Sequence, residues 1–135
     1  MSRKLFVNLP VRDLTKSVDF FTTLGFTFNP QFTDERAACM IVSDDAFVML
    51  LVEDFFNTFT NKRTCNSMTH SEAIIAMSAD SKQQVDDLVN NAFAVGAQPA
   101  NEPVDDGFMY GWSFQDLDGH LWEVIYMDPK ATAAR

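Results

Sequence analysis

The chain has 135 residues, a formal net charge of −9 and a hydrophobic fraction of 47% that includes 13 phenylalanines. This length fits one domain, and the acidic balance excludes nucleic acid and anionic membrane surfaces as expected partners, since no basic stripe is present to neutralise phosphates. No apolar run approaches the ~20 residues of a membrane span. Cys39 and Cys65 form neither a disulfide framework nor a metal motif, so we expect a cytoplasmic protein with reduced cysteines.

The first half of the chain predicts the order strand, helix, strand, strand, strand. Residues 5–11 alternate between two faces, which is typical of a strand. Asp13 is a good N-cap for a helix that ends at Gly25. The remaining strands are expected at residues 26–32, with a break at Asn29 and Pro30, and at residues 36–42 and 47–53.

The second half repeats this order. A strand is expected at residues 72–78, and Ser81 with Gln84 forms a capping box for a helix that ends at Gly96. A short strand near residues 97–100 and a hairpin within residues 107–129 follow. The repeat predicts a duplicated βαβββ module inside one α+β domain of residues 1–135, with the modules at about residues 4–54 and 71–128.

A connecting segment at about residues 55–70 separates the two modules. Phe55, Phe56 and Phe59 lie close to one face of a predicted helix, and a polar, turn-forming stretch follows them. Two interpretations stay open. The segment is either a lid or dimer contact, or a connecting helix packed against the sheet.

The last hairpin carries a carboxylate, Glu123, in the middle of an otherwise apolar strand. Ionised carboxylates are rarely buried without a partner, because their desolvation costs several kcal/mol or more. Glu123 is therefore the residue that most needs a chemical explanation. It either has a functional role or is a relic, neutralised by protonation or satisfied by a hydrogen bond from Asn8, Tyr110 or Trp112. If the hairpin loop has an even number of residues, Trp112 lies opposite Glu123 and Tyr110 lies two residues further along the same face.

With both modules placed, the chain resembles the glyoxalase/bleomycin-resistance/extradiol-dioxygenase superfamily, also called vicinal oxygen chelate proteins. Two motifs carry the resemblance together with the duplication: VRDLTKSVDFFTTLGF at residues 11–26 and FQDLDGHLWEV at residues 114–124. The resemblance implies two modules whose curved sheets form a shared cleft. It also implies a homodimer as the expected assembly.

In the metal enzymes of this superfamily, four cleft positions ligate a divalent ion. The resemblance assigns these positions to Phe6, Leu50, Ile74 and Glu123. Only Glu123 is a ligand type, because phenylalanine, leucine and isoleucine donate no lone pair. The two histidines of the chain are interpreted as surface residues. We therefore predict no divalent metal and no other cofactor.

The predicted ligand-binding surface is aromatic with few polar groups, which suits a small organic molecule. Its residues are Phe6, Asn8, Leu50, Ile74, Tyr110, Trp112 and Glu123. For the individual aromatic residues, simple core packing is the alternative role.

Two classes of function stay open. The favoured one is a metal-independent binder of a small organic molecule, resembling the drug-sequestering resistance proteins of the superfamily. The other is an enzyme, either a divergent metal-dependent lyase or dioxygenase, or a metal-free isomerase in which Glu123 removes a proton next to a carbonyl group.

Overall fold

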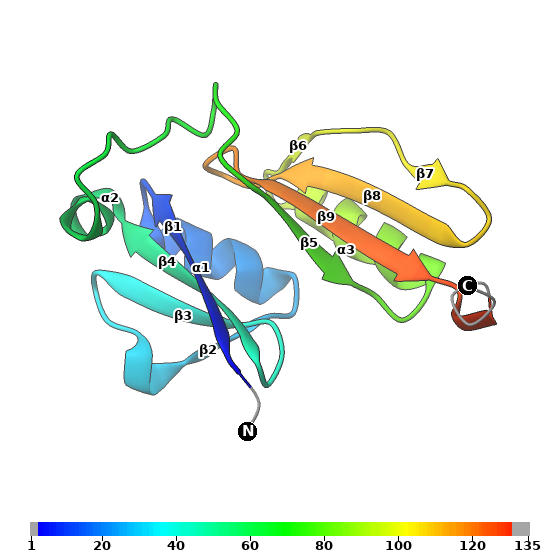
Figure 1. Cartoon of the computed structure of the whole chain (residues 1–135), viewed down its shortest axis with the longest axis horizontal. Helices are drawn as coiled ribbons and strands as arrows, with labels where there is room; N and C mark the ends of the chain where they lie inside the picture. Colours follow the sequence, from blue (N-terminus) through cyan, green and yellow to red (C-terminus); the bar gives the residue numbers. More distant parts are fainter. Residues whose placement is uncertain (1–2, 131–135) are drawn as a thin grey trace. The chain divides into compact units, whose positions relative to one another are not determined.

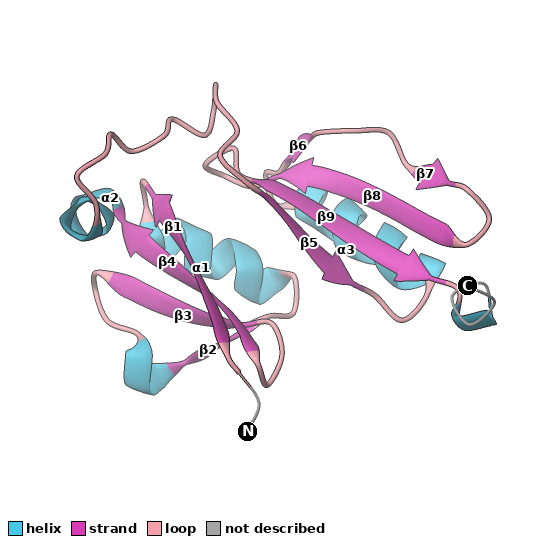
Figure 2. Ribbon diagram, viewed as in Figure 1, coloured by secondary structure: helices cyan, strands magenta, loops and turns pink. Residues whose placement is uncertain are grey.

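The computed structural model describes residues 3–130, and the chain divides into two compact units, residues 1–64 and 65–135. Each unit contains one β-sheet with one long helix on a single face (Figures 1 and 2). The boundary between the units falls in the connecting segment expected from the sequence. Within the described residues, no helix is long and apolar enough to cross a membrane.

Unit 1 contains a four-stranded sheet in the order β1-β4-β3-β2, in which β1 runs parallel to β4 and the other neighbours are antiparallel. Its elements in chain order are β1 (Leu5–Val11), α1 (Leu14–Thr23), β2 (Thr27–Asn29), the 3-10 turn η1 (Pro30–Phe32), β3 (Ala37–Ile41), β4 (Ala46–Val52), α2 (Glu53–Phe56) and the 3-10 turn η2 (Asn57–Phe59).

Helix α1 begins and ends where the sequence indicates. The Asp13 side chain accepts a hydrogen bond from the backbone N–H of Lys16 at 3.1 Å, and Gly25 adopts a φ of 101° just beyond the helix. The core of unit 1 lies between this helix and the sheet. It includes the fully buried Phe21, Met40 and Leu50.

The start of the connecting segment packs within unit 1, where α2 contacts β1 and β4. The Arg36 guanidinium lies 4.3 Å from the centre of the Phe55 ring, and the Phe55 and Phe59 rings meet edge to face at 5.0 Å. This packing agrees with the interpretation of a connecting helix placed against the sheet. The roles of lid or dimer contact stay predictions.

Unit 2 repeats the topology, with the sheet order β5-β9-β8-β6 and a further short strand, β7, paired with β8. Strand β5 runs parallel to β9, as β1 does to β4. Its elements are β5 (Ile74–Ser78), α3 (Lys82–Ala94), β6 (Gln98–Pro99), β7 (Val104–Asp105), β8 (Met109–Gln115) and β9 (Leu121–Met127).

Helix α3 is capped as predicted, because Ser81 Oγ accepts the backbone N–H of Gln84 at 3.1 Å. Its buried side chains cover a sheet face that includes Phe114 and Trp122, whose rings stack with centres 6.5 Å apart. Burying two such large aromatic side chains contributes several kcal/mol through the hydrophobic effect.

The α+β fold class predicted from the sequence is confirmed, and two details differ. The strand expected at residues 26–32 breaks at Asn29 and Pro30 as predicted but does not resume, because Pro30 opens a 3-10 turn whose first N–H, that of Gln31, is accepted by Asn29 Oδ1 at 3.0 Å. Strand β7 was not expected, since Val104 and Asp105 are too short a run to show alternation.

Candidate functional site

The turn between β8 and β9 is organised by one buried carboxylate, that of Asp116. Its Oδ1 accepts the backbone N–H groups of Asp118 at 2.9 Å and His120 at 3.0 Å, and its Oδ2 accepts the indole N–H of Trp122 at 2.9 Å. Burial raises the pKa of Asp116, although the charge of His120 and these hydrogen bonds oppose that shift. The first aspartate of the FQDLDGHLWEV motif thus has a structural role.

The same turn fixes the register of the hairpin and corrects one expectation. Residues 116–120 form a five-residue loop between Gln115 and Leu121, rather than an even loop. Glu123 therefore lies opposite Ser113, and Trp112 lies opposite Val124. Because side chains alternate along a strand, Trp112 and Tyr110 point to the opposite face of the sheet from Glu123.

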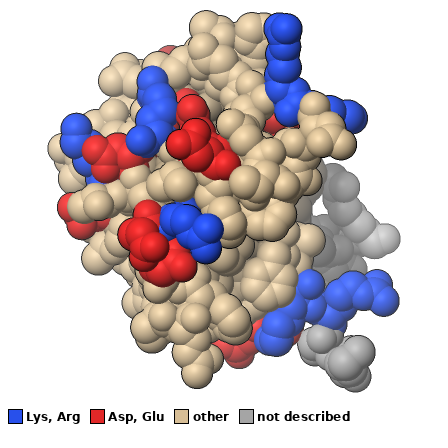
Figure 3. Space-filling view, turned by 90° about the vertical axis from the view of Figure 1, so that its left-hand side faces the viewer, with Lys and Arg blue, Asp and Glu red and all other residues tan. Residues whose placement is uncertain are grey.

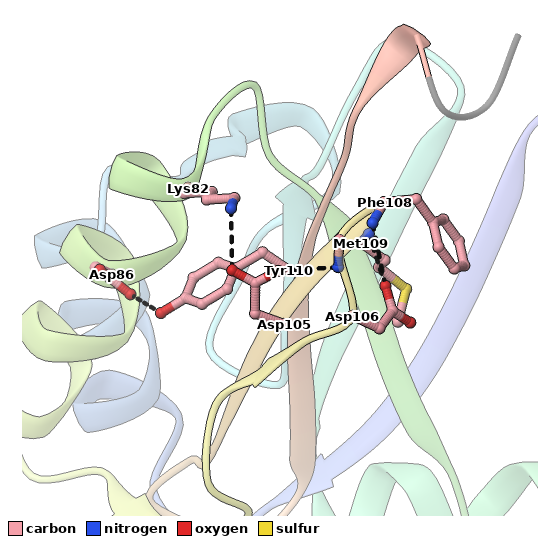
Figure 4. Close-up of polar contacts among 8 residues, drawn as sticks. Lys82, Asp86, Asp105, Asp106, Phe108, Met109 and Tyr110 are labelled. Carbon is pink, nitrogen blue, oxygen red and sulfur yellow. Dashed lines mark hydrogen bonds and ion pairs between the residues drawn. The ribbon is translucent and has the colours of Figure 1, made fainter.

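Tyr110 and Trp112 lie in the packing between the sheet and α3. The ring of Trp112 meets Phe93 of the helix edge to face at 5.6 Å. The Tyr110 hydroxyl donates a 2.6 Å hydrogen bond to Asp86 of the helix (Figure 4), and this bond together with burial raises the pKa of Tyr110 to about 12. The position of both residues favours the core-packing alternative over contact with a ligand on the face of Glu123.

An ion pair next to Tyr110 links β7 to the start of α3. Lys82 Nζ lies 3.0 Å from Asp105 Oδ2, and the same ammonium lies 5.8 Å from the centre of the Tyr110 ring (Figure 4). Beyond Asp105, the Asp106 carboxylate accepts the backbone N–H groups of Phe108 and Met109 and shapes the turn into β8. Lys82, Asp105 and Asp106 therefore have structural roles in this part of unit 2.

Glu123 stands on the face of the unit 2 sheet that lies away from α3. Its neighbours across the ladder are short, Ala76 on β5 and Ser113 on β8. The other side chains of β9 on this face are apolar, and so is Ile74 of β5, which is 58% exposed. Glu123 is half-buried, and no other described residue of unit 2, residues 65–130, forms a hydrogen bond or ion pair with its side chain.

In unit 1, Phe6 and Asn8 lie together on the face of the sheet away from α1. Phe6 is 48% exposed and stacks on Phe47 with ring centres 4.9 Å apart and planes 14° apart. Asn8 is exposed and pairs in register with Met49 of β4.

Leu50 does not share that face, which corrects a second expectation. It pairs with Leu9 and Ala38, points toward α1 and is fully buried. The turn before β4 places Phe47 opposite Ile41, as the turn before β9 places Leu121 opposite Gln115, so the residue of unit 1 that corresponds to Glu123 is Met49. Aligning the two turns by their aspartates alone, without the strand register, assigns this position to Leu50 instead, one residue too far along β4.

The two histidines lie in turns. The backbone N–H of His70 donates to Asn66 at 2.8 Å, and that of His120 donates to Asp116. Within residues 3–130, no group of three or more histidine, cysteine, aspartate or glutamate side chains is placed to hold a metal ion. The fully buried Cys39 and the half-buried Cys65 are free thiols.

The end of the connecting segment is fixed to the β8–β9 turn inside unit 2. Ser67 Oγ donates a 2.7 Å hydrogen bond to the carbonyl of Asp118. Gly119 adopts a φ of 86°, and a Cβ added there would lie 2.6 Å from the Ser67 carbonyl and 2.9 Å from Met68 Sδ. A glycine is therefore required both by the backbone and by the close approach of the segment.

Surface charge gives no further site on the face drawn in Figure 3. Lysine and arginine side chains lie next to aspartate and glutamate side chains there, and no continuous patch of one sign is visible. Among the ion pairs of the described residues, Lys4 Nζ lies 3.6 Å from Asp45 Oδ1.

Comparison with known proteins identifies what the fold resembles. Residues 3–43 match the family model "Bleomycin resistance protein-like N-terminal". No curated protein matches the sequence.

Among solved structures, a hypothetical protein from S. aureus is 28% identical, with 93% of this chain and 94% of that chain covered and a TM-score of 0.77. A glyoxalase-related enzyme from Fulvimarina pelagi is 17% identical, with 93% and 88% covered and a TM-score of 0.77. The fosfomycin resistance protein FosX from Listeria monocytogenes, in complex with Mn(II) and sulfate, is 17% identical, with 100% and 98% covered and a TM-score of 0.69.

The chain thus has a mixed α+β fold of two similar units, which is the fold of its solved neighbours. The resemblance indicated by the motifs is confirmed at the level of the fold, which the chain shares with solved proteins described as glyoxalase/bleomycin resistance protein/dioxygenase family members.

Proposed function

We propose that this protein binds a small organic molecule on the face of the unit 2 sheet away from α3, without a complete metal site. The observation that carries the proposal is Glu123. It is the one ionisable side chain among the described strand residues of that face, and its carboxylate has no partner among the described residues of unit 2. Holding a half-buried carboxylate on an apolar surface costs free energy. A ligand that interacts with it would offset that cost.

The composition of the surrounding surface supports an organic ligand. Ile74, Leu121 and Ile125 supply apolar contact area around a single ionisable group, and the polar Ser113 and Gln115 of this face are bonded to the backbone of Asn101 and Pro99. Apolar area with few free polar groups is the usual makeup of small-molecule sites. In unit 1, the stacked and partly exposed Phe6 and Phe47 form an aromatic surface of the same general kind.

The donor set does not fit a divalent metal ion. Of the positions that the resemblance assigns to ligands, Phe6 and Ile74 carry only carbon side chains, and Leu50 is buried on the opposite face of its sheet. Met49, which corresponds to Glu123 in unit 1, offers only a thioether, a ligand that suits soft ions. One carboxylate alone binds a divalent ion weakly, because affinity comes from several preorganised ligands.

The second candidate is an enzyme, which the similarity to FosX in complex with Mn(II) favours at the level of fold. Because the donor set does not fit a metal ion, the enzyme that remains as a candidate is the metal-free isomerase. In it, Glu123 would be the base that removes a proton next to a carbonyl group. Such an isomerase needs a second acid to protonate the product. No other ionisable side chain stands on the same face among the described strand residues, which weighs against this candidate.

We also propose that the protein forms a homodimer. Phe59 is 67% exposed at the end of η2, and a partner would cover this large apolar side chain. Sedimentation at tens of micromolar, roughly the range where ordinary dimers persist, tests this. A compact monomer there rejects the dimer without affecting the proposed ligand site.

The proposed function is tested by two measurements on wild type, Glu123→Gln and the control Glu102→Gln, which removes the same charge from an exposed loop. Screening small organic compounds by NMR should find compounds that shift the amide signals of Ala76, Ser113 and Glu123 in wild type and bind differently to Glu123→Gln. A screen in which no compound shifts these signals rejects the proposal.

Elemental analysis of protein purified without chelator is the second measurement. We expect no stoichiometric zinc, iron, nickel or manganese. A near-stoichiometric metal that is lost in Glu123→Gln and retained in Glu102→Gln would restore the metal-dependent enzyme.

A further inference from the structure

We propose that the ligand of the Glu123 face carries an organic cation, such as a protonated amine attached to an apolar body. This inference rests on the proposed function and narrows the ligand to one chemical class. Three features of the face support it: the short, exposed Ala76 next to Glu123, the lack of a partner for the Glu123 carboxylate within unit 2, and the apolar side chains of Ile74, Leu121 and Ile125.

Ala76, the exposed neighbour of Glu123 on β5, leaves space next to the glutamate carboxylate. Directly opposed residues in a sheet have Cβ atoms about 4.5–5.5 Å apart. Ala76 and Ser113 end one and two atoms from their Cα atoms, whereas the glutamate carboxylate ends further from the sheet. Its oxygens therefore extend beyond the exposed Ala76, where a group of a few atoms fits, whereas Ser113 is buried beside the β6–β7 loop.

Ser113 is not available to satisfy the carboxylate. Its Oγ accepts the backbone N–H of Asn101 at 2.9 Å and donates to the carbonyl of the same residue at 3.4 Å. The serine hydroxyl hydrogen is thus directed to the β6–β7 loop. The carboxylate of Glu123 is left as an acceptor that only solvent or a ligand can fill within unit 2.

Charge complementarity decides which ligand group fits. An anionic group would be repelled by Glu123 and by the net charge of −9. A neutral donor would form an ordinary hydrogen bond, whereas an ammonium or amidinium group forms a charge-assisted bond of roughly twice the strength. Apolar contact with Ile74, Leu121 and Ile125 would hold the rest of the molecule.

Three probes of similar size and different charge test the inference by NMR titration: benzylammonium, benzyl alcohol and benzoate. We expect benzylammonium to shift the amide signals of Ala76, Ser113 and Glu123 and to bind roughly tenfold more tightly than benzyl alcohol. Glu123→Gln should weaken benzylammonium roughly tenfold and leave benzyl alcohol within about twofold. Glu102→Gln should change neither affinity, which excludes an effect of net charge alone.

Each contrary outcome has a distinct meaning. Equal binding of benzyl alcohol and benzylammonium, or tighter binding of benzoate, overturns the cationic ligand and leaves the proposed small-molecule function standing. Benzylammonium binding that persists in Glu123→Gln overturns the role of this carboxylate. Absence of any shift with benzylammonium at about 10 mM, a concentration that detects millimolar affinity, also overturns the inference, and the compound screen then decides the proposed function separately.

Discussion

The indole Nε1 of Trp122 donates a 2.9 Å hydrogen bond to Oδ2 of Asp116, and both side chains are buried. The other oxygen of the same carboxylate accepts two backbone N–H groups of the β8–β9 turn. One side chain thus satisfies three donors. It also fixes the five-residue loop that places Glu123 on the face away from α3.

Asp116→Ala should destabilise the protein by about 2–4 kcal/mol, because it leaves the buried Trp122 indole and the backbone N–H groups of the turn without an acceptor. Urea unfolding measures the change. Asp44→Ala, in the exposed turn before β4, is the matched control and should stay within about 0.5 kcal/mol of wild type. Equal effects of the two substitutions would show that Asp116 does not organise its turn.

Gly119→Ala should be more destabilising than Gly107→Ala. Both glycines have a positive φ, 86° and 96°, so both substitutions carry a backbone cost of about 1 kcal/mol. Only at Gly119 does the added Cβ meet other atoms, those of Ser67 and Met68, whereas nothing lies within 4 Å at Gly107.

The difference in unfolding free energy between these two variants therefore reports how firmly residues 65–70 are fixed to the turn. We expect Gly119→Ala to lose about 1–3 kcal/mol more, in line with overpacking of a close contact. Faster limited proteolysis within residues 65–70 should accompany the loss. Equal losses in the two variants would mean that the segment moves aside at little cost.

The order of elements could be predicted from the sequence because each element carries its own local signal. Asp13 and Ser81 mark the starts of α1 and α3, and Gly25 and Gly96 follow their ends with φ values of 101° and 111°. Alternation of apolar residues marks the central strands. These signals depend on neighbours in the chain.

The face of the sheet on which each side chain lies was less predictable, because a change of one residue in the loop length moves every side chain of a strand to the other face. An even β8–β9 loop would put Trp112 opposite Glu123, whereas the observed five-residue loop puts Ser113 there. The aspartate that opens the turn could have indicated this, since an Asp side chain often accepts hydrogen bonds from the backbone two residues on. That the same side chain also binds Trp122 depends on tertiary packing, which the sequence pattern does not specify.

Tyr110 should give the protein an alkaline dependence of stability. Its pKa in the folded state is about 12, above the ordinary value of 10.0, so the folded protein holds the hydroxyl proton more tightly than the unfolded chain does. The contribution to stability is therefore fully present below pH 10 and lost as the pH rises toward 12. Unfolding by urea across this range should show wild type losing more stability than Tyr110→Phe.

The cause of the shift is tested by Asp86→Asn. The hydrogen bond to Asp86 is the largest contribution to the raised pKa of Tyr110, so an uncharged amide should bring the pKa back toward 10.0. Ultraviolet absorbance of tyrosinate, taken as the difference from Tyr110→Phe, follows this titration. An unchanged pKa in Asp86→Asn would assign the shift to burial instead.

Glu123→Gln should leave the free energy of unfolding unchanged or raise it, within about 0.5–1 kcal/mol. No described residue of unit 2 pairs with the carboxylate, so the substitution breaks no hydrogen bond within the unit and removes the cost of holding a charge on a largely apolar face. Asp116→Asn is the informative contrast, because an amide has one acceptor oxygen and cannot satisfy both the Trp122 indole and the turn N–H groups as the carboxylate does. Urea unfolding of the two variants at neutral pH should therefore give changes of opposite sign or clearly different size. A loss of 2 kcal/mol or more in Glu123→Gln, the size of about one buried charged hydrogen bond, would mean that the carboxylate has a structural partner, and the proposed ligand site would lose its main support.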